Sequence, residues 1–220
     1  MKKINYKAVI FDLDGTLLNT LEDLADSMNS VLMKSGFPVH DVNSYRYFVG
    51  EGIEFLVSRA LPNNIHTDKS IINQYVNAVR EEYIKHWDKK THPYKGIPEL
   101  LDKLTELNIK LTVLSNKPDE FTKLSVAKFL SLWTFKIVLG ARNTVPKKPD
   151  PAGAFEIAEH LKIATDEFLY LGDTGTDMKT AVSAGMYPVG VLWGFRESGE
   201  LLNNGAKVLI KEPIELLRYL

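Results

Sequence analysis

The sequence contains no cysteine, which excludes disulfide bonds, thiol nucleophiles and thiolate metal ligands. It also lacks an excess of either charge: 27 basic and 28 acidic residues give a net charge of −1, so no general attraction to nucleic acid or to an anionic membrane is expected. No apolar run approaches the roughly 20 residues of a bilayer span, and the basic start "MKKINYK" is not followed by the apolar stretch of a signal peptide. We therefore expect a soluble, cytoplasmic protein without a nucleic-acid or membrane partner.

The chain does contain enough apolar residues for a sizeable core, since 45% of its 220 residues are hydrophobic. Six short aliphatic runs occur in continuous rather than alternating form, which is typical of strands that are covered on both faces. These expected strands are 8–11, 111–114, 135–139, 168–171, 189–192 and 207–210.

Helical patterns lie between these runs. In "IPELLDKLTEL", residues 97–107, leucines recur on one stripe, and Pro98 suits a first helical turn. Alternation of strands and helices predicts an α/β fold with a doubly wound, Rossmann-like parallel sheet.

The first interval differs, because nearly a hundred residues without a convincing strand follow the first run. They show helical patterns after Thr20, a plausible N-cap, and over residues 52–61 and 68–87. A simple crossover needs far less chain. We therefore expect an all-helical cap domain, residues 17–93, inserted after the first strand of a core formed by 1–16 and 94–220, and serving as a lid over a site.

Polar residues follow several of the expected strands. Because the carboxyl ends of parallel strands meet at one edge of a sheet, these residues should converge there. They are Asp12, Asp14 and Thr16 after the first strand, Ser115 and Asn116 after the second, Lys147 and Lys148 before a helix, and Asp173 and Asp177 near the fourth.

Two carboxylates as close as Asp12 and Asp14 repel each other and are costly to bury without positive charge nearby. A divalent cation and a lysine among the acids would supply that charge. A donor set of oxygens without histidine or thiolate favours Mg²⁺, which commonly binds one or two carboxylates together with a substrate phosphate. The pattern therefore predicts a phosphoryl-transfer site.

The stretches "DLDGT", "SNK", "KPDP" and "GDTGTD", in this order, resemble the four motifs of the haloacid dehalogenase superfamily, and more narrowly its phosphatases with a small helical cap. "VGEGIEFLVSRAL" and "GVLWGFRESGEL" resemble the phosphoglycolate phosphatase branch. The resemblance spans nearly the whole chain. It implies a magnesium-dependent hydrolase of small phosphate monoesters, with a small phosphorylated metabolite such as 2-phosphoglycolate as its partner, and we expect a monomer or a weak homodimer.

The resemblance also implies the catalytic roles. Asp12 would be the nucleophile that forms an aspartyl-phosphate, and Asp14 the general acid and then the general base. Lys148 would hold the phosphate and balance the charge of Asp12. Because Asp14 is present, whereas the halide-removing members lack a second aspartate and need no metal, dehalogenation is rejected.

For the metal, the resemblance implies Asp12, Asp173 and the backbone carbonyl of Asp14 as ligands. Asp177, at i+4 from Asp173 and thus expected one helical turn later, would support the metal indirectly or coordinate it weakly. Residues expected to bind the phosphate or surround it are Thr16, Ser115, Asn116 and Lys148.

Several single residues remain open in the sequence. Asn116 either contacts the leaving group or caps the following helix, and Arg59 either contacts a substrate carboxylate or forms a surface salt bridge. Lys117 and Lys147 are expected to face solvent. Two departures from the family pattern also occur: Asn19-Thr20 stands where many relatives have Asp-Ser, and Thr174 replaces the commoner serine.

Three other functions are compatible with parts of the pattern. One is an inorganic pyrophosphatase of the same fold. The second is a sugar phosphomutase, although those relatives usually carry Glu-Asp-Ser where this chain has Gly172-Asp173-Thr174. The third is a non-catalytic phosphoacceptor module similar to receiver domains, which lack the cap and the Asp14 acid.

Overall fold

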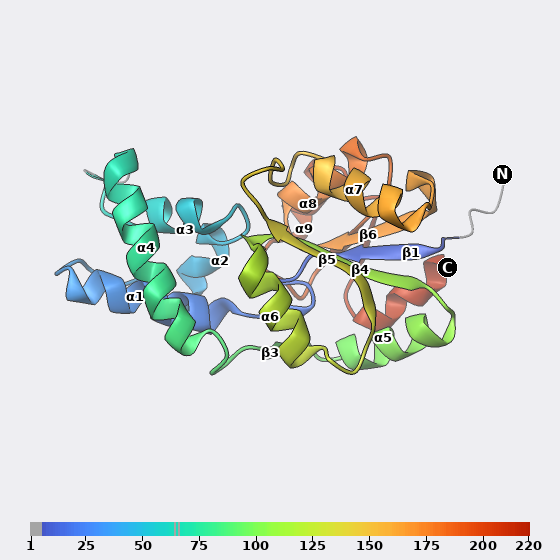
Figure 1. Ribbon diagram of the computed structural model, residues 1–220, viewed down its shortest axis with the longest axis horizontal. Helices are drawn as coiled ribbons and strands as arrows, with labels where there is room; N and C mark the ends of the chain where they lie inside the picture. Colours follow the sequence, from blue (N-terminus) through green and yellow to red (C-terminus); the bar gives the residue numbers. More distant parts are fainter. Residues whose placement is uncertain (1–5, 64, 66) are drawn as a thin grey trace. The chain divides into compact units, whose positions relative to one another are not determined.

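The computed structural model describes residues 6–63, 65 and 67–220, and the chain divides into two compact units (Figure 1). One unit contains the chain up to Leu18 and again from Pro93 to Leu220; the other is Asn19–His92. None of the helices in these described ranges has the length and apolar character that a bilayer crossing requires.

The first unit is built on a six-stranded parallel sheet with the order β5-β4-β1-β6-β7-β8. The chain crosses from one side of β1 to the other between β5 and β6, so the predicted doubly wound α/β fold is confirmed. The strands are β1 (Ala8–Phe11), β4 (Lys110–Pro118), β5 (Phe135–Ala141), β6 (Phe168–Gly172), β7 (Tyr187–Val191) and β8 (Val208–Ile210).

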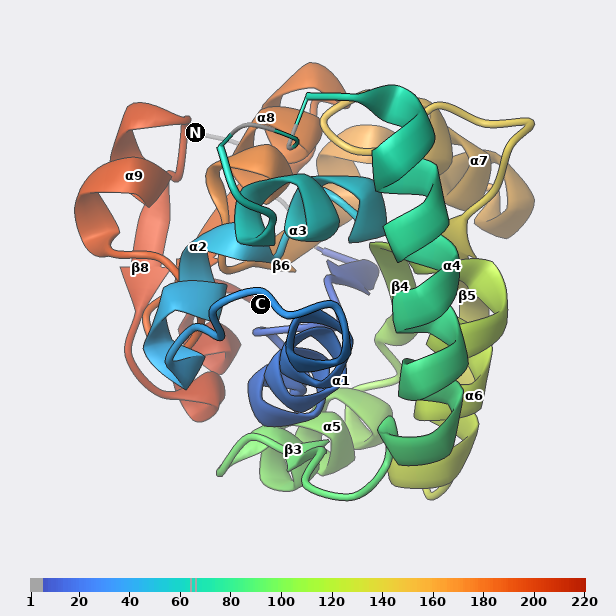
Figure 2. The same cartoon turned by 90° about the vertical axis from the view of Figure 1, so that its left-hand side faces the viewer.

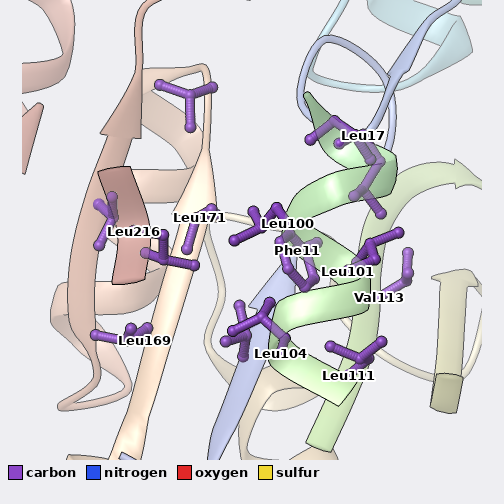
Figure 3. Close-up of a cluster of buried hydrophobic side chains, with 14 of the residues drawn as sticks. Phe11, Leu17, Leu100, Leu101, Leu104, Leu111, Val113, Leu169, Leu171 and Leu216 are labelled. Atoms are coloured by element: carbon purple, nitrogen blue, oxygen red, sulfur yellow. The ribbon is translucent and has the colours of Figure 1, made fainter. Parts of the chain in front are cut away.

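Helices cover both faces of this sheet, which explains why its strands are continuously apolar. In β1, Val9 and Phe11 belong to one buried cluster, whereas Ala8 and Ile10 belong to another. Successive side chains of a strand point to opposite faces, so these two clusters are the two cores of the unit. Figure 3 shows the first of them, where leucines of helix α5 (Ile97–Glu106) pack against Phe11.

The first core also receives residues of α6 (Asp119–Phe129) and of the 3₁₀ segment η3 (Pro213–Tyr219). The second core lies under α7 (Ala152–Leu161) and α8 (Gly175–Ser183), on the other side of the sheet in Figure 1. The remaining elements of the unit are α9 (Ser198–Asn203) and the 3₁₀ segment η2 (Thr165–Glu167).

The strand boundaries differ from the sequence expectation in informative places. β4 continues to Pro118 instead of ending at Leu114, so the polar "SNK" belongs to a strand end rather than to a loop. Two strands of two residues each, β2 (Leu18–Asn19) and β3 (His92–Pro93), form a separate two-stranded sheet. Segments this short leave no hydrophobic periodicity, which is why the sequence did not indicate them.

The second unit is helical, with a short 3₁₀ turn. Its elements are α1 (Leu21–Lys34), η1 (Val42–Ser44), α2 (Tyr45–Phe48), α3 (Ile53–Ala60) and α4 (Lys69–His86). Figure 2 shows α4 running along α1, with α3 next to α4. Asp68 caps α4 through bonds from the backbone N–H groups of Ser70 and Ile71.

The predicted position of Thr20 as the N-cap of α1 is confirmed, but its side chain does not cap the helix. The buried Oγ1 of Thr20 has no hydrogen-bond partner among the described residues. The backbone N–H of Leu21 instead lies 3.4 Å from Oδ1 of Asn19. Thr20 has φ −109° and ψ 2°, which is not the extended conformation from which an N-cap side chain usually reaches the first N–H groups.

The two ends of the helical unit are held together by a buried carboxylate. Asp23, in the first turn of α1, accepts hydrogen bonds from the backbone N–H groups of Lys90 (3.0 Å) and Thr91 (2.8 Å) and from the Thr91 hydroxyl (2.7 Å). Hydrogen bonds to a charged acceptor are stronger than neutral ones, so Asp23 fixes residues 90–91 beside the start of α1.

Candidate active site

The residues expected to carry the chemistry converge at the carboxyl edge of the sheet. Asp12 follows β1, whose neighbours are β4 on one side and β6 on the other. Asp173 follows β6, and Ser115 lies in the last part of β4. Lys148 comes from the connection between β5 and α7. The site therefore lies at the point where the strand order reverses, the usual position of ligands in open α/β sheets.

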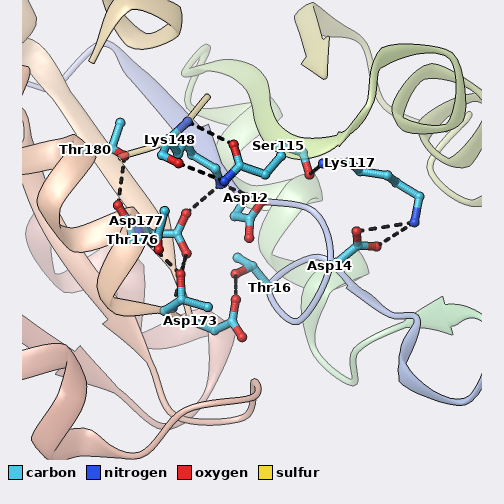
Figure 4. Close-up of polar contacts among 12 residues, drawn as sticks. Asp12, Asp14, Thr16, Ser115, Lys117, Lys148, Asp173, Thr176, Asp177 and Thr180 are labelled. Atoms are coloured by element: carbon cyan, nitrogen blue, oxygen red, sulfur yellow. Dashed lines mark hydrogen bonds and ion pairs between the residues drawn. The ribbon is translucent and has the colours of Figure 1, made fainter. Parts of the chain in front are cut away.

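Three buried carboxylates and one buried ammonium group form its centre (Figure 4). One carboxylate oxygen from each of Asp12, Asp173 and Asp177 lies within 4.8 Å of the others. Nζ of Lys148 is 2.8 Å from Oδ1 of Asp12 and 2.6 Å from Oδ1 of Asp177. The lysine thus bridges the expected nucleophile and the aspartate at the start of α8.

The burial and close spacing of these charges shift the pKa values of Asp12, Asp173 and Lys148. Burial, followed by the neighbouring charge of Asp177, raises the pKa of Asp12, while Lys148 opposes the rise. Burial alone would lower the pKa of the Lys148 ammonium, but Asp12 and Asp177 raise it. Burial and the charge of Asp177 raise the pKa of Asp173 to about 7. Without further positive charge, the cluster therefore holds protons that isolated aspartates would release.

The donor set fits a divalent cation. When ionised, the three carboxylates and the single ammonium leave two negative charges, which match the charge of Mg²⁺. Oδ1 of Asp12 is buried and, among the described residues, accepts no hydrogen bond of good geometry although Lys148 is close. Hard carboxylate oxygens without nitrogen or sulfur ligands favour Mg²⁺ over Zn²⁺ or copper.

Asp14 has a partner that the sequence did not indicate. Nζ of Lys117 lies 3.1 Å and 3.3 Å from the two carboxylate oxygens of Asp14, and the lysine side chain is only 4% exposed. The expectation that Lys117 faces solvent is therefore wrong. Lys117 is the penultimate residue of β4, two residues before α6 begins, and its side chain reaches Asp14 in the segment after β1.

Asn116 pairs with the backbone of Lys148, a contact that the sequence did not indicate, and α6 has Pro118 as its N-cap with no side-chain capping bond. Nδ2 of Asn116 donates to the carbonyl oxygen of Lys148 at 3.0 Å, and its Oδ1 accepts from the Lys148 backbone N–H at 2.9 Å. The side chain of Ser115 accepts a hydrogen bond from the backbone N–H of Lys117 at 3.2 Å. Ser115 and Asn116 are both buried at the strand end.

The expected helical spacing of Asp173 and Asp177 is also wrong. α8 begins at Gly175, so Asp173 lies in the turn before the helix, and Thr174 is the N-cap. Asp177 forms a capping box with Thr174, whose hydroxyl donates to Oδ2 of Asp177 at 2.6 Å. Oδ1 of Asp177 accepts a hydrogen bond from Lys148, so the Asp177 carboxylate links the N-terminal turn of α8 to the lysine. The threonine in the fourth motif keeps the hydroxyl that this cap requires.

Asp173 is held from two sides. The Thr16 hydroxyl donates to its Oδ1 at 3.1 Å, and the backbone N–H of Phe195 donates to its Oδ2 at 2.8 Å. In addition, the indole N–H of Trp193 donates to the carbonyl oxygen of Thr16 at 2.9 Å. Residues 193–195 follow β7 and were missed as site residues, although they belong to "GVLWGFRESGEL", a stretch that the motif comparison had singled out.

Two glycines allow this close packing around Asp173. Gly15 has φ +89°, and a Cβ there would lie 2.3 Å from Oδ2 of Asp173. A Cβ on Gly194 would lie 2.2 Å from Cβ of Asp173 and 2.5 Å from the carbonyl oxygen of Gly15. A side chain at Gly15 would be strained by the positive φ and would displace the Asp173 carboxylate, whereas one at Gly194 would also clash with the Gly15 backbone, so both positions favour glycine.

The sequence also left open the surroundings of two other basic residues, Arg59 and Lys147. Arg59, in the helical unit, forms an ion pair with Glu51 and donates to the carbonyl oxygens of Tyr47 (3.2 Å) and Phe48 (3.4 Å). Lys147 is exposed, as expected.

Comparison with known proteins agrees with the geometry. The model of the haloacid dehalogenase-like hydrolase family matches residues 9–191. A phosphoglycolate phosphatase from Nitrosospira multiformis is 32% identical over 221 residues, which cover 97% of this chain and 95% of that protein. One from Pseudomonas savastanoi pv. phaseolicola is 28% identical over 215 residues, covering 96% of this chain and 78% of the relative.

A solved structure from Lactobacillus delbrueckii subsp. bulgaricus, described as a candidate phosphoglycolate phosphatase, has a TM-score of 0.89 and 28% identity, and it covers 96% of this chain and 97% of its own. The family match runs from β1 to β7 and includes all four motif stretches. The resemblance in the motifs is thereby confirmed. The chain belongs to the haloacid dehalogenase-like hydrolases, and within that family of enzymes it is similar to the phosphatases.

Proposed function

We propose that this protein is a Mg²⁺-dependent phosphatase that hydrolyses small phosphate monoesters through an aspartyl-phosphate, with 2-phosphoglycolate or a similar compound as substrate. The observation that carries the proposal is the buried arrangement of Lys148 between Asp12 and Asp177, with Asp173 beside them. The names of the curated relatives, which are phosphoglycolate phosphatases, support the same class of substrate.

Asp12, Asp173 and the backbone carbonyl of Asp14 would hold the metal, with Asp177 supporting it. When bound, Mg²⁺ supplies positive charge that reduces the repulsion between the Asp12 carboxylate and an anionic phosphate. The protein contributes a prearranged set of donors: Thr16 and the Phe195 backbone orient Asp173, and Asp177 together with Asp12 orients Lys148.

In the first half of the reaction, a carboxylate oxygen of Asp12 attacks phosphorus. The bond between phosphorus and the ester oxygen breaks, and Asp14 in its protonated form gives its proton to the departing alkoxide. Lys148 binds a phosphate oxygen and balances the negative charge that accumulates near Asp12. Asp14 is paired with Lys117 in this structure, so to act as the acid it must leave that ion pair carrying a proton, which the second half of each cycle returns to it.

In the second half, Asp14 acts as a base. It takes a proton from water while the water oxygen attacks phosphorus, and the bond between phosphorus and Asp12 breaks. Inorganic phosphate leaves, and the Asp12 carboxylate is regenerated. The charges around Asp12 serve both halves, because the same phosphoryl group is transferred twice.

The helical insertion, residues 17–93, is proposed to act as a cap that limits access of bulk water during the transfer. A cap of this size favours a small phosphorylated metabolite over a phosphoprotein or a nucleic acid.

The proposal is tested by phosphate release from a panel of 2-phosphoglycolate, other small phosphomonoesters, a hexose phosphate and inorganic pyrophosphate, with and without Mg²⁺. We expect turnover of small monoesters that chelation abolishes, and no isomerised sugar phosphate. Asp12→Asn should lower kcat by at least about 10³-fold, because the nucleophile is removed without a change of shape.

The matched control is Asp166→Asn, at an exposed aspartate in η2, which should retain full activity. Absence of phosphate release from every monoester would refute the proposed function. A stable phosphorylated Asp12 without turnover would favour the phosphoacceptor alternative instead.

A further inference from the structure

The side chain of Asn116 replaces a neighbouring strand for one residue of the chain. Lys148 lies between β5 and α7, outside any helix or strand, yet it is buried. Its backbone N–H donates to Oδ1 of Asn116 at 2.9 Å, and its carbonyl oxygen accepts from Nδ2 of Asn116 at 3.0 Å. One side-chain amide thus satisfies the backbone N–H and the backbone C=O of one buried residue that lies outside the sheet.

The pairing is chemically specific. An amide offers one donor and one acceptor side by side, which is the complement of a backbone N–H and C=O. An aspartate would retain the acceptor but present a second oxygen to the Lys148 carbonyl oxygen. A leucine or an alanine would leave both backbone groups without partners, which is costly in a buried position.

The position of the Lys148 backbone matters because its ammonium group has two close partners. Nζ lies 2.8 Å from Asp12 and 2.6 Å from Asp177, so a small movement of the main chain would change both contacts. Asn116 is itself fixed, since it belongs to β4, which pairs with β1 and β5. The Asn116 amide therefore ties the Lys148 backbone, which lies in a connecting segment, to a strand that the sheet holds in place.

We propose that Asn116 is a positioning residue for Lys148: its side-chain amide fixes the Lys148 backbone and thereby places the ammonium group between Asp12 and Asp177. This inference rests on the proposed phosphatase function for its kinetic consequence, but the hydrogen-bond pair itself does not depend on that function. Asn116 acts through Lys148 and does not need to contact the substrate.

The kinetic test is a double-mutant cycle with Asn116→Ala and Lys148→Ala. Asn116→Ala alone should lower kcat/KM for the best monoester by about 10- to 100-fold, because misplacement of a catalytic group by about 1 Å has an effect of this size. In the Lys148→Ala background, the same substitution should change kcat/KM by less than about threefold. An equal loss in both backgrounds would overturn the proposal. Where Lys148→Ala turnover is too slow, the cycle is read from the dissociation constant of inorganic phosphate in the presence of Mg²⁺.

The second readout requires no turnover. Exchange of the Lys148 amide hydrogen should be at least tenfold faster in Asn116→Ala than in the wild-type protein, whereas the amide of Leu171 in β6 should be unchanged. Unaltered Lys148 exchange overturns the proposal even if the protein is a phosphatase. Faster exchange in a protein that hydrolyses no phosphomonoester retains the structural role of Asn116 and refutes the proposed function alone.

The chain offers a matched control. In the helical unit, Asn29 makes the same pair of bonds with the backbone of His40, at 2.8 Å and 3.0 Å. Oδ1 of Asn29 also accepts a hydrogen bond from the Tyr45 hydroxyl at 2.7 Å. Asn29→Ala should therefore lower the free energy of unfolding by at least as much as Asn116→Ala. Its effect on kcat/KM should be the same with and without Lys148, since it does not act through that residue.

A second variant, Asn116→Asp, has nearly the same shape and separates loss of the donor from loss of volume. It should also lower kcat/KM at least tenfold. Wild-type kcat/KM in Asn116→Asp would contradict the role of the amide donor.

Discussion

At the scale of single residues, the buried carboxylates at the sheet edge are the main source of electrostatic cost. Asp12, Asp173 and Asp177 are each at most 5% exposed, and Lys148 supplies one positive charge among them. Burial of like charges this close together raises the pKa of Asp12 and Asp173. The metal-free protein should therefore respond to pH in a way that reports on this cluster.

We expect Asp173 to reduce the stability of the metal-free protein as the pH rises. Its pKa is about 7 in the folded state, against an ordinary value of 3.8. Between these values the folded protein retains a proton that the unfolded chain releases, so the contribution is largest below pH 4 and is lost as the pH approaches 7. The slope is about 1.4 kcal/mol per pH unit for one proton.

The measurement is urea unfolding with a chelator at several pH values, for the wild type and for Asp173→Asn. The variant lacks this titration, so its free energy of unfolding should increase relative to the wild type between pH 4 and pH 7. A difference that does not vary with pH would contradict the expected shift. Excess Mg²⁺ should stabilise the wild type more at pH 8 than at pH 5.5, because the ion competes with protons for the carboxylates.

The Lys117–Asp14 pair gives a second prediction at this scale. Lys117→Met would leave a carboxylate that is 12% exposed without its partner. Breaking a fully buried pair in this way costs about 3–5 kcal/mol, and we expect about 1–3 kcal/mol for this partly accessible pair. Urea unfolding should detect the loss, and Lys117→Met/Asp14→Asn should recover part of it. Lys179→Met, at an exposed position of α8, should have little effect. If the double variant is less stable than Lys117→Met, the ion pair is not the cause.

The residue types at the site could be predicted from the sequence, but several of their partners could not. Asp12, Lys148, Asp173 and Asp177 follow from the expectation that strand ends meet at one edge, and the structure brings them together. The partner of Lys117 depends on the exact end of β4, which a run of apolar residues does not define. The pairing of Asn116 with a backbone is invisible in sequence, because any buried peptide unit could be its partner.

At the scale of elements, the segment after β7 acts as a support for the edge of β6. Phe195 donates to Asp173 through its backbone, and Trp193 donates to Thr16. Backbone donors leave no signal in the residue type, so this contribution was not predicted. Gly194, between the two, approaches Asp173 so closely that the fit depends on the missing side chain.

Gly194→Ala should therefore weaken metal binding. The added methyl group would lie 2.2 Å from Cβ of Asp173 and would push the segment away, lengthening the bond from Phe195. We expect the affinity for Mg²⁺ to fall by about 10- to 100-fold, the usual effect of disturbing groups that orient a metal ligand. Calorimetric titration with Mg²⁺ measures the change.

The chain again contains a control. A Cβ on Gly199, in α9, would meet nothing within 4 Å, so Gly199→Ala should leave Mg²⁺ affinity unchanged and should stabilise the protein by about 0.5–1 kcal/mol. Equal Mg²⁺ affinities for Gly194→Ala and the wild type would mean that residues 193–195 do not orient Asp173.

The hydrophobic patterns of the sequence predicted the order and type of most helices and strands, but not the residues at which they begin and end. The observed strand order confirms the doubly wound sheet. It could be predicted because continuous apolar strands separated by amphipathic helices allow few other arrangements. β7 starts at Tyr187, two residues before the apolar run, and includes Pro188. β2 and β3 lie where the chain leaves and re-enters the sheet unit, and they have no pattern of their own.

At the scale of the whole molecule, the chain contains two units that differ in secondary structure. The sheet unit contains the acidic cluster, Lys148 and the residues that bond to them, whereas the unit Asn19–His92 is helical. The sheet unit should therefore retain its fold and its metal site without the helices, while a role of the helices in excluding water should be lost.

Replacing residues 19–92 by a short Gly/Ser linker tests this division. We expect circular dichroism to show a folded α/β protein, and calorimetry to show Mg²⁺ binding. The value of kcat/KM for 2-phosphoglycolate should fall by about 10²-fold, because positioning and exclusion of water by a lid contribute to the rate. The activated ester p-nitrophenyl phosphate should lose less. Undiminished hydrolysis of 2-phosphoglycolate would rule out the cap role.

Asp23 has a consequence for how such a chain could evolve. Because its carboxylate joins the start of α1 to Thr91, which is 68 positions later in the chain, the segment between them begins and ends at neighbouring points. Bringing the two ends of this long segment together costs chain entropy, and the contacts within the helical unit offset that cost without help from the sheet. The helical unit is therefore an insertion that closes on itself. During evolution it could be lengthened, shortened or exchanged without changing how the strands of the sheet pair.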